Sequence, residues 1–149
     1  MGSDWTPELT LNDDLLDGQH VDLYRKLEAC AAALEGPRET LESLLAGVAE
    51  ALVDHVAIEE RLMDETLYPE RVRHRSAHEL FLADFERMRT ELRASGPTPL
   101  VADWVRRRIP EWLSFHIRVN DQPLAAWLSR RQEREKDGKA RKDNGRQLS

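Results

Sequence analysis

Several features of secreted and membrane proteins are missing from this sequence of 149 residues. It contains one cysteine, Cys30, so no internal disulfide can form, and its alanine-rich surroundings predict a buried, inert thiol. The N-terminus has neither a basic start nor an apolar run, so we expect no signal peptide. No apolar stretch approaches the roughly 20 residues that a helix needs to span a bilayer. These absences predict a chain without a membrane partner, located in the cytoplasm.

Negative charge is concentrated in the first 129 residues. The whole chain has a net charge of −6, but the segment from Arg130 onward has eight Lys and Arg against four Asp and Glu, a net of +4. The remainder therefore carries −10. An acidic body disfavours nucleic acid as a partner, because attraction to phosphate needs a basic surface. The mixed charges of residues 131–149 predict a disordered tail after a folded domain over residues 1–130.

Strand signals are also missing, since no β-branched residues alternate and no Asn-Gly turn separates apolar segments. Helix-forming residues dominate, and breakers interrupt them at Gly36-Pro37, Leu67-Tyr68-Pro69 and Ser95-Gly96-Pro97-Thr98-Pro99. After an N-terminal arm, apolar residues recur at helical spacing in four segments, over about 13–35, 38–65, 70–94 and 99–118. Short connections make neighbouring helices antiparallel, so we predict an all-α, up-down-up-down four-helix bundle.

Two features predict irregular helix in the last third of the chain. Pro110 removes one backbone hydrogen bond from the fourth segment and should bend it. A break is expected near Val119, because the following Asn120-Asp121-Gln122-Pro123 is typical of a helix cap with proline in the first turn. A short fifth helix through about Arg130 would then close the end of the bundle.

Every predicted helix carries histidine on its apolar face: His20 on the first, His55 on the second, His74 and His78 on the third, and His116 on the fourth. Glu59 follows His55 by four residues, which places both on one helical face. A single such histidine is ordinarily a core residue with a satisfied hydrogen bond. Together, the four helices point five imidazoles towards the bundle axis.

This arrangement predicts a metal site. Burying five imidazoles and a carboxylate without a metal would cost on the order of several kcal/mol for each unsatisfied group. Cys30 is ten residues past His20, which disfavours a soft zinc or copper site, whereas imidazole with carboxylate suits iron. Five imidazoles indicate two ions. Asp121 is the candidate for a second carboxylate near His116, but five residues are about 140° apart on a continuous helix, so it turns inward only at the predicted break.

The spacing of these residues resembles the ligand pattern of the hemerythrins. The set reads His20, His55-x-x-x-Glu59, His74-x-x-x-His78 and His116-x-x-x-x-Asp121. Trp5 and the run from Asp17 through Gln19-His20 resemble the bacterial branch, the bacteriohemerythrins. The resemblance spans about residues 5–128 and fills all seven ligand positions.

The resemblance implies a non-haem di-iron centre that cycles between Fe²⁺ and Fe³⁺. One iron would be bound by His74, His78 and His116, and the other by His20 and His55. Glu59 and Asp121 would bridge the two ions together with an oxo or hydroxo group. Two roughly octahedral irons have about twelve positions, and this ligand set leaves one of them open, on the iron with two histidines. In the family, dioxygen binds there reversibly, so we expect oxygen carriage, storage or delivery and no enzymatic activity.

Reversible oxygen binding needs a dry, aliphatic pocket without a proton donor. Four residues beside the expected ligands suit such a pocket, although core packing also accounts for them: Leu23, Val56, Trp112 and Ile117. Val56 departs from the family pattern, in which an aromatic residue is common. A smaller residue there would widen the pocket and speed autoxidation.

Three alternatives remain open. A di-iron oxidase, peroxidase or nitric oxide reductase is less favoured, because ferritin-like enzymes use Glu-x-x-His pairs and no Glu here precedes His by three residues. An oxygen or redox sensor would act on an unknown protein partner through the acidic surface or the tail. Iron storage is inefficient with two sites per chain. We expect a monomer with dioxygen as its small-molecule partner.

Overall fold

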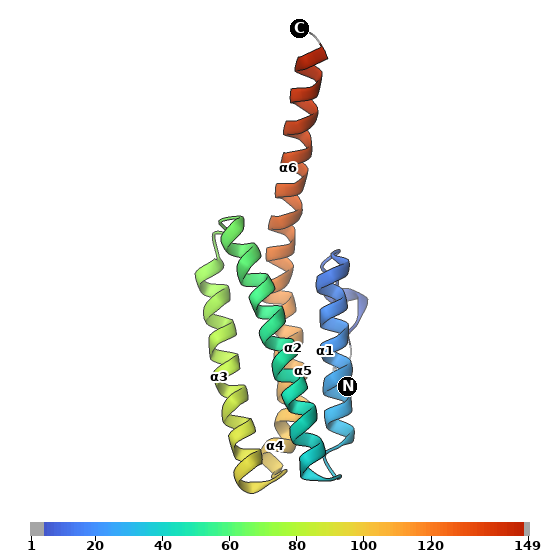
Figure 1. The fold of residues 1–149 in the computed structure, drawn as a ribbon, viewed down its shortest axis with the longest axis vertical. Helices are drawn as coiled ribbons and strands as arrows, with labels where there is room; N and C mark the ends of the chain where they lie inside the picture. The colour runs from blue at the N-terminus through green and yellow to red at the C-terminus, as the bar shows by residue number, and fades with distance from the viewer. Residues whose placement is uncertain (1–4, 148–149) are drawn as a thin grey trace.

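Breaker residues divide the chain into four antiparallel helical rods (Figure 1). The structure, a computed structural model, describes residues 5–147. An N-terminal arm contains the short helix η1 (Pro7–Leu9) and precedes α1 (Asp14–Ala32), α2 (Arg38–Glu65) and α3 (Arg71–Ser95). The fourth rod is a continuous series of helical segments: α4 (Pro99–Asp103), η2 (Trp104–Arg108), α5 (Ile109–His116), η3 (Ile117–Asp121) and α6 (Gln122–Gln147). The predicted all-α bundle is confirmed.

Local sequence explains where the rods begin and end. The carboxylate of Asp13 accepts a hydrogen bond from the Leu16 amide at 3.0 Å and caps the start of α1. α3 ends at Gly96, whose φ of +79° favours glycine and where an added Cβ would lie 2.7 Å from the Arg38 guanidinium. Thr98 then caps α4 by accepting from the Val101 amide. The chain therefore turns where the breakers predict.

The bundle interior contains a large apolar layer and a smaller one. The large layer includes Leu41 and Leu45 from α2 and Phe85 and Leu92 from α3, each at most 1% exposed. At the other end, a small apolar cluster is built from Met63, Tyr68 and Leu124, with Trp127 and Leu128 packed against it. The predicted histidine stripe lies between these layers along α2 and α3, so apolar packing seals it at both ends.

The single cysteine is buried in the large apolar layer, as predicted. Cys30 is 0% exposed, and burial raises the pKa of its thiol to about 11. The thiolate is therefore disfavoured, which makes Cys30 a poor nucleophile and a poor metal ligand.

Both irregularities predicted in the fourth rod exist, but they are π-helical turns within a continuous rod. The Ile109 amide donates to the Trp104 carbonyl across η2, and the Gln122 amide donates to the Ile117 carbonyl across η3, each five residues back. Each wide turn lies just before a proline, at position 110 or 123. A proline ring clashes with the carbonyl four residues earlier, and each of those carbonyls lies inside a π turn, which relieves the clash.

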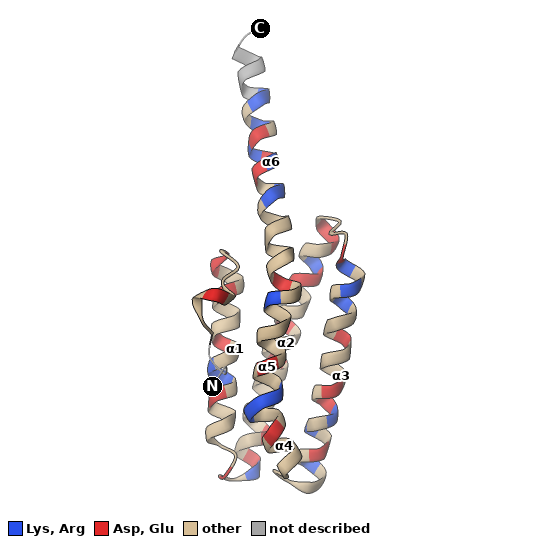
Figure 2. Ribbon diagram, turned by 180° about the vertical axis from the view of Figure 1, so that it is seen from behind, with Lys and Arg blue, Asp and Glu red and all other residues tan. Residues whose placement is uncertain are grey.

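The prediction of a break near Val119 with a separate, short fifth helix is therefore corrected. α6 continues the fourth rod to Gln147, so the residues expected to form a disordered tail make the outer half of this helix, apart from 148 and 149, which lie outside the described residues. Lys, Arg and Glu are good helix formers, and pairs such as Arg131 with Glu135 add weak support. Figure 2 shows these mixed charges along the projecting helix. Among the described residues, no helix is both long and apolar enough to cross a membrane.

The N-terminal arm is fastened next to the histidine layer. The Asp17 carboxylate, on α1, accepts hydrogen bonds from the Thr10 hydroxyl and the Leu11 amide, both at 2.8 Å. The Gln122 side chain, on α6, donates to the Glu8 carbonyl at 2.8 Å. Leu11 is buried by this arrangement. The arm is thus held by Asp17, which lies three residues before His20, and by Gln122, which follows Asp121. Both His20 and Asp121 are predicted ligands.

Candidate metal centre

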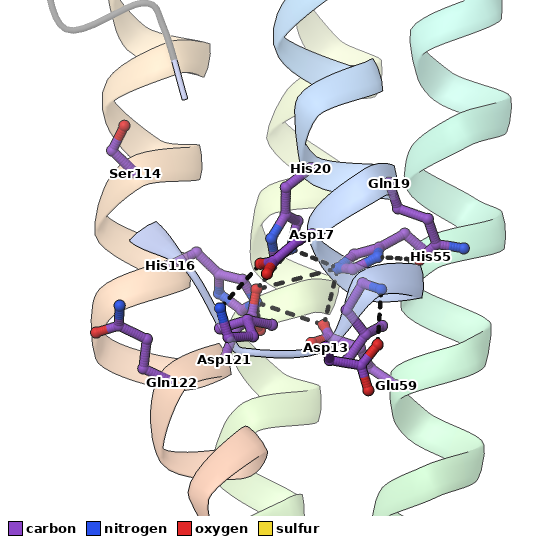
Figure 3. Close-up of polar contacts among 12 residues, drawn as sticks. Asp13, Asp17, Gln19, His20, His55, Glu59, Ser114, His116, Asp121 and Gln122 are labelled. Atoms are coloured by element: carbon purple, nitrogen blue, oxygen red, sulfur yellow. Dashed lines mark hydrogen bonds and ion pairs between the residues drawn. The ribbon is translucent and has the colours of Figure 1, made fainter. Parts of the chain in front are cut away.

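The structure brings all seven predicted ligand residues together in two buried groups that share Asp121. Figure 3 shows five of them: His20, His55, Glu59, His116 and Asp121. All seven are at most 4% exposed. The four rods each contribute: His20 from α1, His55 and Glu59 from α2, His74 and His78 from α3, and His116 with Asp121 from α5 and η3. The four-residue spacings on α2 and α3 place each of those pairs on one helical face, as expected.

Asp121 reaches the cluster because of the π turn. It follows His116 by five residues, and the i to i+5 register of η3 places it about one turn below that histidine. The sequence predicted an inward Asp121 only at a helix break. The widened turn gives the same side-chain direction without interrupting the rod.

The two oxygens of Asp121 face different histidines. Oδ1 lies 3.1 Å from His74 Nε2 and 3.2 Å from His116 Nε2. Oδ2 lies 3.2 Å from His20 Nε2 and 4.0 Å from His55 Nε2. The carboxylate therefore stands between a group with three histidines and a group with two.

Glu59 presents one oxygen to both groups. Its Oε1 lies 3.2 Å from His78 Nε2, 3.4 Å from His55 Nε2 and 3.5 Å from His74 Nε2. Its Oε2 is buried without a hydrogen-bond partner. Two carboxylates thus lie at the boundary between the two histidine groups.

The donor atoms of the cluster converge on one another and leave several buried atoms without hydrogen bonds. The Nε2 atoms of His20 and His55 are 3.0 Å apart, and so are those of His78 and His116. The Nε2 of His74 and both oxygens of Asp121 have no hydrogen-bond partner. Orphaned polar atoms in a dry core are costly, whereas converging imidazole nitrogens and carboxylate oxygens are what a divalent or trivalent cation requires. The residues therefore fit a metal centre.

The charges of the cluster also prepare it for cations. Burial alone would lower the pKa of His55, but close contact with the carboxylates of Asp121 and Glu59 outweighs burial and raises it to about 10. The same balance raises the pKa of His74 to about 9. Burial and the neighbouring Asp121 would raise the pKa of Glu59, yet hydrogen bonds from the imidazoles lower it to about 2. The site thus holds positive charge strongly, and metal ions would replace its protons.

Two polar residues outside the predicted ligand set touch the histidines. His55 Nδ1 lies 2.6 Å from the Gln19 side-chain oxygen, and His78 Nδ1 lies 3.5 Å from a Glu60 oxygen. Neither residue was predicted to have a role in the site. Their position next to His20 and Glu59 in the sequence is the available signal, but which histidine each one meets depends on the packing of the helices.

The four residues predicted to line an oxygen pocket lie in different environments. Leu23 and Ile117 are at most 1% exposed and belong to the large apolar layer, whereas Val56 is only half-buried. Trp112 is half-buried and stacks on His116, with ring centroids 4.6 Å apart. Phe81, which was not among the predicted site residues, stacks on Trp112 with ring centroids 3.5 Å apart. An aromatic stack therefore covers His116.

Comparisons with known proteins agree with this geometry. The chain is 27% identical to a bacteriohemerythrin of Stenotrophomonas maltophilia (strain R551-3) over 124 residues, which cover 81% of this chain and 78% of that protein. It is also 27% identical to bacteriohemerythrins of Pseudomonas paraeruginosa (strain DSM 24068 / PA7) and Pseudomonas aeruginosa (strain LESB58), over 87% of this chain and 95% of each relative. Residues 11–128 match the family described as "Hemerythrin HHE cation binding domain". Because this match spans most of the chain and includes the whole buried cluster, the protein belongs to the hemerythrin family.

Proposed function

We propose that this protein binds dioxygen reversibly at a non-haem di-iron centre. The observation that carries the proposal is the placement of Asp121, one oxygen of which faces His74 and His116 while the other faces His20 and His55. A carboxylate in this position suits two cations rather than one. Membership of the hemerythrin family implies non-haem iron binding, and the seven buried side chains supply suitable ligands.

The proposed assignment follows the two histidine groups. His74, His78 and His116 would hold one iron, and His20 and His55 the other. Glu59 and Asp121 would bridge them, together with an oxo or hydroxo group. When bound, the two irons would supply two electrons and a position at which a small ligand can bind.

The surrounding residues favour binding over catalysis. Leu16, Leu23 and Ile117 are at most 1% exposed and carry no group that donates a proton. The apolar layers above and below the cluster exclude water, which prevents proton leakage to a bound ligand. These side chains would thus keep a bound ligand dry, which supports reversible binding. The half-buried Val56 stays the position at which we predict a wider pocket and faster autoxidation.

A carrier, store or delivery protein is the role that this chemistry suits best. A sensor would need a partner-binding element that changes with oxygen, and a di-iron oxidase, peroxidase or nitric oxide reductase would need a placed proton donor. The cytoplasmic location, the monomeric state and the absence of a nucleic-acid partner stay predictions.

The deciding experiment measures iron per chain and visible absorption on reduced, anaerobic protein. We expect two irons and a visible band that appears when air is admitted and disappears when oxygen is removed. Irreversible conversion to a ferric form by air would overturn reversible binding and favour the redox-enzyme or sensor function. Fewer than two irons in fully loaded protein would overturn the di-iron centre itself.

A further inference from the structure

Two histidines of the cluster make contacts of different charge on their outer side. The Nε2 atoms of His55 and His78 point into the cluster, so in a metal-bound ring the proton sits on Nδ1, which faces outwards. From there His55 donates to the amide oxygen of Gln19 at 2.6 Å. His78 Nδ1 lies 3.5 Å from the carboxylate of Glu60 and makes no hydrogen bond. One ring of each histidine group therefore faces a polar side chain, but only His55 is hydrogen-bonded to it.

The contact to Gln19 joins two rods. Gln19 lies on α1, one residue before His20, whereas His55 lies on α2. The Nδ1 of His20 itself is buried without a hydrogen-bond partner. In the two-histidine group, the bond from His55 to Gln19 is thus the hydrogen bond that orients a ring through its outward-facing Nδ1.

The contact to Glu60 is weaker and partly neutralised. The Glu60 side chain is 27% exposed, and the same oxygen that faces His78 lies 3.7 Å from Arg75 Nε. Arg75 is in turn held by both oxygens of Asp64, at 2.9 and 3.0 Å. Glu60 nonetheless presents a carboxylate to His78, whereas Gln19 presents a neutral amide to His55.

We propose that Gln19 is the positioning residue of the two-histidine site, and that the contrast between its neutral amide and the Glu60 carboxylate makes the two metal positions electronically unequal. This inference rests on the proposed di-iron function. A carboxylate beside a metal-bound histidine makes the ring a stronger electron donor and favours the ferric ion. A histidine that donates to a neutral amide is oriented by that bond but gains less electron density. An ion held by His20 and His55 would then keep the ferrous state more readily than one held by the three-histidine group.

The effect of Gln19 on the orientation of His55 can be separated from the effect of charge at this position with two nearly isosteric variants of Gln19. Gln19→Leu removes the acceptor, and Gln19→Glu keeps an acceptor while adding a charge. Gln132→Leu, at an exposed position on α6, is the matched control for the loss of an amide. Circular dichroism of the metal-free variants establishes that each one folds.

The first readout is the affinity of metal-free protein for Co²⁺, followed by visible absorption with a competing chelator. We expect Gln19→Leu to weaken one of the two sites by about 10–100-fold and Gln19→Glu to retain wild-type affinity or exceed it. The control should match wild type. Two unchanged sites in Gln19→Leu would overturn the positioning role while leaving the di-iron function intact.

The second readout is the midpoint potential of the iron-loaded protein in an anaerobic redox titration. Gln19→Glu should shift the potential downwards, and Glu60→Gln should shift it upwards. Equal potentials in wild type and both variants would overturn the proposed electronic contrast. Wild-type protein that binds fewer than two ions would instead overturn the proposed function and this inference together.

Discussion

Two layers of the bundle interior are equally buried but are stabilised in different ways. Leu41, Leu45 and Leu92 fill the large apolar layer, in which removal of apolar surface from water supplies most of the stabilisation. The histidine layer, which is equally dry, consists of polar donor atoms whose hydrogen bonds are incomplete. The same helical periodicity builds both layers, so burial alone does not separate structure from function. The two layers differ because the apolar layer is complete without a ligand, whereas the histidine layer is not.

Removal of a proposed bridging carboxylate should have the largest effect on this contrast. Asp121→Ala or Glu59→Ala should lose one or both irons per chain, because each carboxylate faces both histidine groups. Metal analysis of purified, iron-loaded variants measures the loss. The exposed Asp84→Ala is the matched control and should retain its iron. Full iron retention in both buried variants would contradict the bridging assignment.

Cavities at two positions of the large apolar layer, of which one is next to the histidines, should distinguish an effect on stability from an effect on oxygen binding. Leu45→Ala and Leu23→Ala should each lower the free energy of unfolding by about 2–5 kcal/mol, since both side chains are buried. Only Leu23 lies one turn from a proposed ligand, so only its variant should shorten the lifetime of the oxygenated form. Denaturant unfolding and the decay of the visible band provide the two measurements.

The control for these cavities is Leu80→Ala, at a position that is 71% exposed, and its unfolding free energy should change little. Equal oxygenated lifetimes in the Leu23 and Leu45 variants would show that Leu23 does not belong to the oxygen pocket.

The pH dependence of the metal-free protein should come from the histidine layer. His55 and His74 have folded pKa values of about 10 and about 9, above the ordinary 6.5, so their contribution is complete below pH 6.5 and disappears as pH rises through those values. Glu59 has a folded pKa of about 2, below the ordinary 4.5, so its contribution is lost as pH falls towards 2. Thermal unfolding should therefore show greatest stability between about pH 4.5 and 6.5.

Bound iron should flatten the alkaline limb of this profile, because metal ions take the place of the protons. An alkaline limb that is equally steep with and without iron would argue against metal binding by these histidines.

The smallest effect is expected from the projecting half of α6. Deletion of residues 133–149 leaves the contact of Arg131 with the Thr66 carbonyl and the whole cluster in place. Iron content and oxygen affinity should not change, and the unfolding free energy should stay within about 0.5 kcal/mol. An oxygen titration of the truncated chain measures this, and a large affinity change would assign the helix a part in the function.

The helix ranges and the candidate ligands were predictable because both depend on local signals. Glycine and proline mark the turns near positions 36 and 96, and four-residue spacing places pairs such as His55 with Glu59 on one face. The π turns were not predicted, although Pro110 and Pro123 marked their positions. A proline excludes regular hydrogen bonding but does not by itself decide between a break and a widened turn.

The sequence by itself determined the composition of the site: five histidines and a carboxylate on the inner faces of four helices, with Asp121 five residues beyond His116. Tertiary structure decided the rest. Only the packed bundle directs the two oxygens of Asp121 to different histidine groups and sets Gln19 of α1 against His55 of α2. The physical reason is that spacing along one helix fixes a face, whereas contacts between helices depend on how neighbouring rods are rotated and aligned.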